Sequence, residues 1–274
     1  MAVRIISAGV GIVIALIVLF LHNTIVLPIA VSLITSIMIF ELFRASKCSE
    51  IYPAIITAIA YGILKIMTFG TDFHKYMFLI ALIAVFAIFI TFILKHKEIT
   101  FEKTSFMLVS MILVPEAMLT TLKTEALDEN HGIVFLVLGL CGAWIADSGA
   151  YFAGTFLGKH KLCPEISPKK TVEGFIGGIV TTAIVFVVFN IVYVNFISNE
   201  DIEVNYIMLG VAGAVCAVIG TVGDLSASMI KRQCGIKDYG NIMPGHGGMM
   251  DRFDSVLFVM PTFYAFLSAM NIYK

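Results

Sequence analysis

The stretch MFLIALIAVFAIFITFIL, residues 77–94, decides the class of fold, because it contains no charged residue. A helix needs about 20 apolar residues to cross the hydrocarbon core of a bilayer, and the chain holds about nine runs of this kind. The expected runs are 3–21, 24–43, 51–69, 74–94, 104–122, 132–158, 172–197, 205–229 and 253–272. The chain is therefore predicted to be an all-α, polytopic integral membrane protein.

The composition of the whole chain agrees with this class. Its 274 residues are 59% hydrophobic and 14% charged, with a mean hydropathy of +0.97. A soluble domain is roughly 45–50% apolar and about 25% charged, so this chain has too little charge to cover a globular surface. Its net charge of −1 excludes a basic nucleic-acid-binding protein. Its five scattered cysteines exclude a disulfide framework.

The distribution of basic residues predicts the orientation. Lys and Arg gather in the short cytoplasmic loops of membrane proteins. With the N-terminus inside, the basic residues of the outer side are Lys75, Lys123 and Lys274, and Lys65 lies within a run. The outer loops carry acid instead, at Asp72, Glu125, Asp128, Glu129, Glu200, Asp201 and Glu203. We therefore expect an N-in/C-out, multi-pass protein of the cell (cytoplasmic) membrane.

The two halves of the chain differ in their polar residues. Residues 1–130 are plain apolar runs with short loops, and they are expected to form N-terminal transmembrane helices. Residues 131–274 carry two long cytoplasmic loops rich in Gly, Asp, His and Lys. This second part is predicted to be a transmembrane catalytic region whose active site faces the cytoplasm.

Asp147 is a carboxylate inside the run 132–158. Such residues are costly in a membrane and commonly face a cavity or a partner. We interpret Asp147 as a substrate or cation contact, and the alternative is a hydrogen bond between helices. Gly142, Gly149 and Gly154 would allow close helix packing in either case.

The loop GKHKLCPEISPKKTVEG, residues 158–174, is rich in lysine. The ordinary excess of basic residues on the cytoplasmic side explains part of this count. Ser167-Pro168 signals a turn and a helix start, so Lys169, Lys170 and Thr171 are expected at the opening of the seventh helix. A helix N-terminus with added lysines suits a phosphate.

The eighth run ends in GTVGDLSASMIKR, residues 220–232, where Asp224, Ser228 and Lys231 are spaced to share one helix face. A carboxylate, a hydroxyl and an amine on one face are unusual for a helix that contacts lipid. We interpret them as functional, and the alternative is a structural polar stripe between helices.

The segment QCGIKDYGNIMPGHGGMMDRFDS, residues 233–255, follows directly. Its glycines on both sides of His246 form a flexible loop whose backbone N–H groups could point at an anion. Asp251 and Asp254 are expected at the start of the last helix, with Arg252 between them.

Aspartates, lysines and a glycine-rich backbone together suit phosphoryl or nucleotidyl transfer. Mg²⁺ takes carboxylate oxygens together with substrate phosphates, and two ions can hold the attacking and leaving oxygens of an in-line displacement. Lysines neutralise charge on the phosphates. One or two Mg²⁺ ions are therefore the expected cofactor.

The stretch SASMIKRQCGIKDYGNIMPGHGGMMDRFD, residues 226–254, resembles the signature of phosphatidate cytidylyltransferases (CDP-diacylglycerol synthases). The matching positions are Ser228, Lys231, Arg232, Lys237, Asp238, Gly240, Pro244, His246, Gly247, Gly248, Asp251, Arg252 and Asp254. Gly223 to Leu225 and the ISPKKTVEG loop also resemble the family. Met243 departs from the usual Leu, Ile or Phe, which is a conservative change. The resemblance covers the C-terminal half of the chain.

The resemblance implies that CTP and phosphatidate react to give CDP-diacylglycerol and pyrophosphate. CTP would arrive from the cytosol and phosphatidate from the inner leaflet, so membrane lipid is itself a partner. The sequence leaves the oligomeric state open, with a homodimer as one expectation.

We assign roles on the same basis. Asp224 and Asp251 are expected to hold metal, with Asp254 and Asp147 as second choices for metal or substrate. The predicted catalytic residues are Asp224, Asp251, Lys231 and His246. The predicted substrate-binding residues are Asp147, Lys169, Lys170, Ser228, Arg232, Lys237, Gly247, Gly248 and Arg252.

Two other functions stay open from the sequence. A related enzyme would use CTP on another lipid phosphate, such as a diether analogue of phosphatidate. A cation-coupled transporter would use Asp147 and Asp224 as ion sites and would not need CTP.

Overall fold

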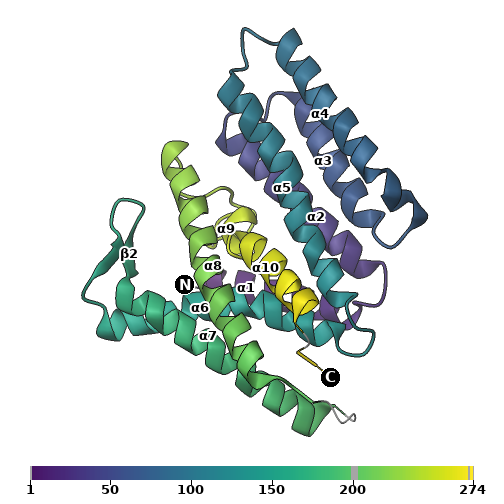
Figure 1. Cartoon of the computed structure of the whole chain (residues 1–274). Helices are drawn as coiled ribbons and strands as arrows, with labels where there is room; N and C mark the ends of the chain where they lie inside the picture. Colours follow the sequence, from purple (N-terminus) through teal and green to yellow (C-terminus); the bar gives the residue numbers. More distant parts are fainter. Residues whose placement is uncertain (1, 199–202, 271, 274) are drawn as a thin grey trace. The chain divides into compact units, whose positions relative to one another are not determined.

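The structure is a computed structural model that describes residues 2–198, 203–270 and 272–273, with side chains from residue 6 onward (Figure 1). A helix lies at each expected apolar run, so the prediction of a helical chain is confirmed. The helices are α1 (Ala2–Phe20), α2 (Val26–Ala45), α3 (Tyr52–Met67), α4 (Met77–Leu94), α5 (Phe101–Glu125), α6 (Gly132–Leu157), α7 (Val172–Val192), α8 (Tyr206–Gln233), α9 (Met250–Phe253) and α10 (Val256–Ala269). Lys274, Glu200 and Asp201, used in the orientation argument, lie outside the described residues.

Several of these helices are long and apolar enough to cross a membrane. Within the described residues there are 6 such stretches, namely Val26–Ala45, Asp72–Leu94, Phe101–Glu125, Gly132–Leu157, Val172–Ile197 and Tyr206–Gln233. Phe78 and Leu94 of α4 are 77% and 76% exposed, as suits contact with lipid. The chain is therefore a multi-pass membrane protein.

The chain divides into two compact units. Unit 1 comprises Met1–Leu122 and Gln233–Phe253, and unit 2 comprises Lys123–Arg232 and Asp254–Lys274. These units differ from the halves 1–130 and 131–274 that the sequence suggests. The glycine-rich segment, Gln233–Phe253, belongs to the same unit as the N-terminal helices.

In unit 1, α2 packs on α3 and α3 packs on α4, and Figure 1 shows these helices side by side. The lysine expected inside an apolar run has a partner here. Lys65 Nζ lies 2.5 Å from Glu116 Oε1, and the Tyr61 hydroxyl donates to the same oxygen at 3.5 Å. Pairing offsets the cost of placing these charges among apolar helices.

In unit 2, α6 packs along most of α7, and Figure 1 shows the two helices together. Small residues permit this approach. A Cβ added at Gly149 would lie 2.8 Å from Thr181 Cβ, and one at Gly178 would lie 2.8 Å from the Ala146 carbonyl oxygen. The close packing expected from the glycines of this run is confirmed.

A β-hairpin connects α6 to α7, where the sequence predicts only a loop and a helix start. Strand β1 (Lys161–Cys163) pairs antiparallel with β2 (Ser167–Thr171), and Lys161 lies opposite Thr171. The prediction that Lys169 and Lys170 lie at the opening of the seventh helix is therefore wrong, whereas Thr171 does lie there. Thr171 is extended, with φ −122° and ψ 157°, and its Oγ1 accepts a hydrogen bond from the Gly174 N–H at 3.1 Å. This residue is the N-cap, so both lysines precede the helix.

Candidate active site

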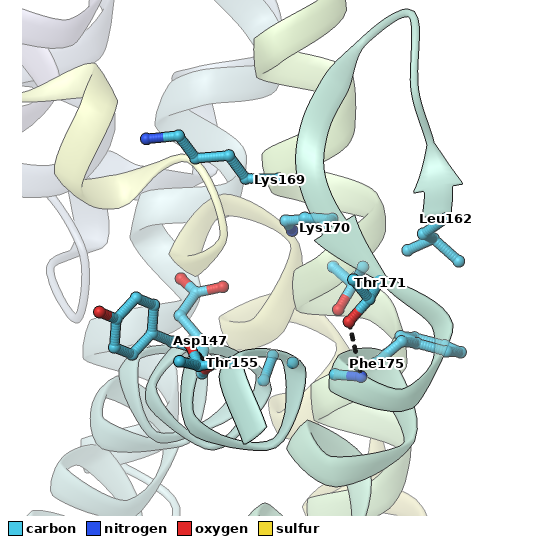
Figure 2. A pocket seen from close by; sticks show the side chains of 12 residues that line it. Asp147, Thr155, Leu162, Lys169, Lys170, Thr171 and Phe175 are labelled. Carbon is cyan, nitrogen blue, oxygen red and sulfur yellow. Dashed lines mark hydrogen bonds between the residues drawn. The ribbon is translucent and has the colours of Figure 1, made fainter. Parts of the chain in front are cut away.

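Unit 2 contains a cavity of about 350 Å³ between α6, the hairpin, α7 and α8. Figure 2 shows Asp147 of α6 with Lys169 and Lys170 of β2 around this space. Leu162 and Phe175 contribute apolar surface to its wall. Ligand pockets are commonly about 300–1,000 Å³ and mix apolar walls with a few polar groups. The cavity thus has the size and the lining of a ligand site, with both charge signs present.

An ion pair links the hairpin to α8. Lys170 Nζ lies 2.5 Å from Asp224 Oδ2, and the two side chains are 22% and 23% exposed. Charges that are partly buried are screened less by salt than charges on an open surface. Two residues that the sequence assigns to one site, 54 positions apart by their numbers in the chain, are therefore in direct contact.

Asp254 interacts electrostatically with Asp224. Its side chain is buried in the turn between α9 and α10, where Oδ1 accepts a hydrogen bond from the Ser255 N–H at 2.7 Å. A Cβ on Gly223 would come within 2.9 Å of the Asp254 carbonyl oxygen, so a glycine at this position allows the close approach. Asp254 also interacts electrostatically with Lys231 and Asp147. Three aspartates and two lysines of unit 2 therefore form one charged cluster.

The turn between α9 and α10 separates two aspartates that the sequence places at the start of one helix. Asp251 and Asp254 are predicted together at the start of the last helix, but α9 ends at Phe253 and α10 begins at Val256. The prediction of one continuous helix is wrong. Aspartate side chains compete with helical backbone hydrogen bonds, as the bond from Ser255 to Asp254 illustrates.

The residues predicted to share one face of a helix all lie within α8. Asp224, Ser228 and Lys231 are half-buried, whereas Arg232 at the end of the helix is exposed. Helical spacing places the first three on one face, and the pairing of Asp224 with Lys170 directs that face to the hairpin.

The glycine-rich loop belongs to unit 1 and is internally bonded. Asp251 Oδ2 accepts hydrogen bonds from the N–H groups of Tyr239 at 2.8 Å and Gly248 at 2.9 Å. Gly247 has a φ of +87°, which glycine adopts without strain. His246 Nδ1 lies 3.0 Å from Ser7 Oγ. The Gly248 N–H, which the sequence analysis offers to an anion, thus already has a carboxylate partner.

The remaining predicted residues of this loop, Lys237 and Arg252, have exposed side chains. Such positions suit contact with a charged ligand from solution, because little desolvation accompanies the pairing.

Two charged residues of α2, Glu41 and Arg44, also bond to this loop and are not among the predicted site residues. The buried carboxylate of Glu41 accepts hydrogen bonds from the N–H groups of Met249 and Met250, and Arg44 Nη2 donates to the Tyr239 carbonyl oxygen at 2.5 Å. A glutamate inside an apolar helix is the signal that could have identified this anchor.

Glu173, in the first turn of α7, bonds to the residues that precede strand β1. Its carboxylate accepts hydrogen bonds from the Lys159 N–H at 3.0 Å and the His160 N–H at 3.2 Å, and His160 Nδ1 lies 2.6 Å from Oε1. These bonds fasten the base of the hairpin to α7, and the hairpin carries Lys169 and Lys170.

The described residues contain no group of three or more His, Cys, Asp or Glu side chains arranged to hold a metal by themselves. Asp224 and Asp254 are neighbours that offer carboxylate oxygens. Mg²⁺ commonly binds one or two carboxylates, substrate phosphates and waters, so this donor set fits that ion. Asp251 belongs to the other unit, and its Oδ2 is engaged by two backbone N–H groups.

Comparison with known proteins identifies the class of enzyme. The sequence matches the Cytidylyltransferase family over residues 2–270. It is 36% identical over 270 residues to the phosphatidate cytidylyltransferase of Bacillus subtilis (strain 168), which covers 94% of this chain and 95% of that protein. It is 34% identical over 263 residues to the phosphatidate cytidylyltransferase of Staphylococcus haemolyticus (strain JCSC1435), which covers 95% of this chain and 96% of that protein.

The chain therefore belongs to the cytidylyltransferase family, and it does so over nearly its whole length. The resemblance that the C-terminal motif indicates is confirmed, and it extends through the N-terminal helices as well.

Proposed function

We propose that this chain transfers the cytidylyl group of CTP to phosphatidate and so makes CDP-diacylglycerol and pyrophosphate. Membership of the cytidylyltransferase family and the names of the relatives support the reaction. The observation that carries the assignment to a site is the charged cluster at the cavity of unit 2, with Lys170 paired to Asp224.

The reaction requires two anions to approach each other. A phosphate oxygen of phosphatidate bonds to the α-phosphorus of CTP, and the bond from that phosphorus to the β-phosphate oxygen breaks. The phosphatidate oxygen is already anionic, so positioning and charge neutralisation matter more than a strong base. Lys169 and Lys170 at the cavity and Lys231 beside Asp254 are placed for that neutralisation.

We further propose that Asp224 and Asp254 would hold Mg²⁺, with Asp147 as an additional contact. Bound there, the ion would neutralise negative charge on the phosphates. Lys170 would then exchange its bond to Asp224 for one to a phosphate oxygen. A role for Asp251 at a second ion stays a prediction.

The topology is part of the same proposal. We place about nine spans in the cell membrane, N-in/C-out, with the active site facing the cytoplasm, because the basic loops then lie inside. Phosphatidate would enter from the inner leaflet. Cysteine labelling from either side of sealed vesicles tests the orientation. Light scattering of the purified protein in detergent tests the expected homodimer.

One assay tests the reaction and its alternatives together. Purified protein receives labelled CTP with phosphatidate, with a diether analogue of phosphatidate, or with no lipid, each with and without Mg²⁺. The proposal predicts a labelled liponucleotide from phosphatidate only when Mg²⁺ is present. A higher rate with the diether analogue would favour the related enzyme, and no transfer to either lipid would contradict both.

A further inference from the structure

The glycine-rich loop of unit 1 is held by a residue far from it in the sequence. Glu41 of α2 is 1% exposed, although it is a carboxylate within an apolar helix. Its Oε1 accepts a hydrogen bond from the Met249 N–H at 3.1 Å, and its Oε2 accepts one from the Met250 N–H at 2.7 Å. A buried carboxylate is costly unless it is hydrogen-bonded, and here both oxygens have backbone partners.

The loop is shaped to receive this carboxylate. A Cβ added at Gly240 or at Gly248 would collide with the carboxylate of Glu41. Side chains at these two positions would therefore displace Glu41 from its place. The requirement for glycine there has a steric cause within unit 1, separate from any contact with a ligand.

Three further hydrogen bonds complete the anchor. Arg44, one turn after Glu41 in α2, donates to the carbonyl oxygen of Tyr239. Asp251 accepts the N–H groups of Tyr239 and Gly248 from within the loop. Together the three side chains hold backbone groups at both ends of the segment 239–250.

We infer that Glu41 is a positioning residue for the nucleotidyl-transfer reaction, which it serves by fixing the conformation of the glycine-rich loop. The inference rests on the proposed function, because the loop carries His246, Gly247 and Gly248 of the family motif. Glu41 itself contacts backbone amides of the loop, so it acts through the loop.

The test replaces Glu41 with Gln. Glutamine keeps the shape of the side chain, but its amide NH₂ is a donor and cannot accept a backbone N–H. One of the two bonds from Met249 and Met250 is thereby lost. Glu116→Gln is the matched control, because it removes a carboxylate charge from a helix of the same unit, and Lys65 and Tyr61, which contact Glu116, lie outside the loop. Both variants are purified in detergent with the wild type, and their melting temperatures are compared.

Two measurements are made on each protein. Hydrogen exchange, followed by mass spectrometry, should be faster in Glu41→Gln for peptides that contain Met249 and Met250, and unchanged there in Glu116→Gln. The kcat for cytidylyl transfer should fall about tenfold or more in Glu41→Gln. Losses of this size are typical when a residue that orients the groups of a site through hydrogen bonds is replaced. Glu41→Asp, which keeps the carboxylate, should recover part of that loss.

The outcomes separate the inference from the proposed function. Unchanged exchange in the loop of Glu41→Gln, or faster exchange with a wild-type kcat, would overturn the positioning role. An equal loss of kcat in Glu116→Gln would also overturn it, since the loss would then follow from destabilised helices. If the wild type transfers no cytidylyl group, the proposed function fails, and the exchange data alone decide whether Glu41 anchors the loop.

Discussion

The ammonium group of Lys170 lies 2.5 Å from the carboxylate of Asp224, so strand β2 is tied to helix α8 beside the cavity of unit 2. This contact joins a lysine-rich loop and a helical aspartate that the sequence only suggests as parts of one site. Within this pair the cation and the carboxylate neutralise each other.

Replacing Lys170 with Met should lower kcat/KM for cytidylyl transfer about tenfold or more, because a hydrogen bond to a charged group contributes about 1.5–3 kcal/mol. Lys169→Met, at the exposed neighbour in the same strand, should have a smaller effect. Steady-state kinetics with varied CTP and varied phosphatidate measure both. A larger loss at Lys169 than at Lys170 would speak against the ion pair as the centre of the site.

Gly223→Ala should destabilise the junction of α8 with the start of α10. The added methyl would lie 2.8 Å from the Phe258 ring and 2.9 Å from the Asp254 carbonyl oxygen. Overpacking of this kind costs about 1–3 kcal/mol. Gly210→Ala in the same helix is the control, because its Cβ meets only Val187 Cγ2 at 3.5 Å. The melting temperature in detergent and the activity should both fall for Gly223→Ala and stay near the wild-type values for Gly210→Ala. Equal melting temperatures for the two variants would refute the close contact.

Thr171→Ala should cost about 1 kcal/mol of stability, which is typical for loss of an N-cap side chain. The hydroxyl accepts the Gly174 N–H, and no methyl group can replace it. Thr171→Ser keeps the hydroxyl and should retain most of the stability. Melting curves of the three proteins decide the point. If serine and alanine destabilise equally, the hydroxyl is not the stabilising group.

The loop before α6 gives a prediction about pH. Partial burial raises the pKa of the Asp128 carboxyl, but hydrogen bonds from the N–H groups of His131 and Asn130 outweigh burial and hold this pKa below its ordinary value. A carboxyl with a lowered pKa in the folded state stabilises the fold above its unfolded pKa, and this contribution is lost as the pH falls through the folded pKa.

The wild type should therefore melt at a higher temperature than Asp128→Asn at neutral pH. The difference should shrink as the solution is acidified below the ordinary aspartate range. A difference that stays constant with pH would show that the ionised carboxylate is not responsible.

The sequence predicts most of the helical fold, because runs such as 77–94 have one outcome in a bilayer. Contacts between segments that are distant in the sequence are harder to predict. Nothing local at Glu41 indicates that its partners are the amides of Met249 and Met250. The strand at 167–171 is also hidden, because its partner β1 is short and Ser167-Pro168 reads equally well as a helix start.

The candidate site shows the same contrast. The chemical character of Asp224, Lys170 and Asp254 follows from their types and their apolar surroundings. Their proximity depends on how α8, the hairpin and the turn before α10 pack, for which Gly223 is the local requirement. Asp251, near Asp254 in the sequence, instead bonds to its own loop.

The most direct test of the account is cytidylyl transfer by purified Asp224→Asn, measured with labelled CTP, phosphatidate and Mg²⁺ beside the wild type. Asparagine preserves the shape of the side chain but removes the charge that pairs with Lys170 and would bind the metal. We expect the variant to insert into membranes and to melt as a folded protein, yet to make almost no CDP-diacylglycerol. Wild-type activity in Asp224→Asn would contradict this expectation.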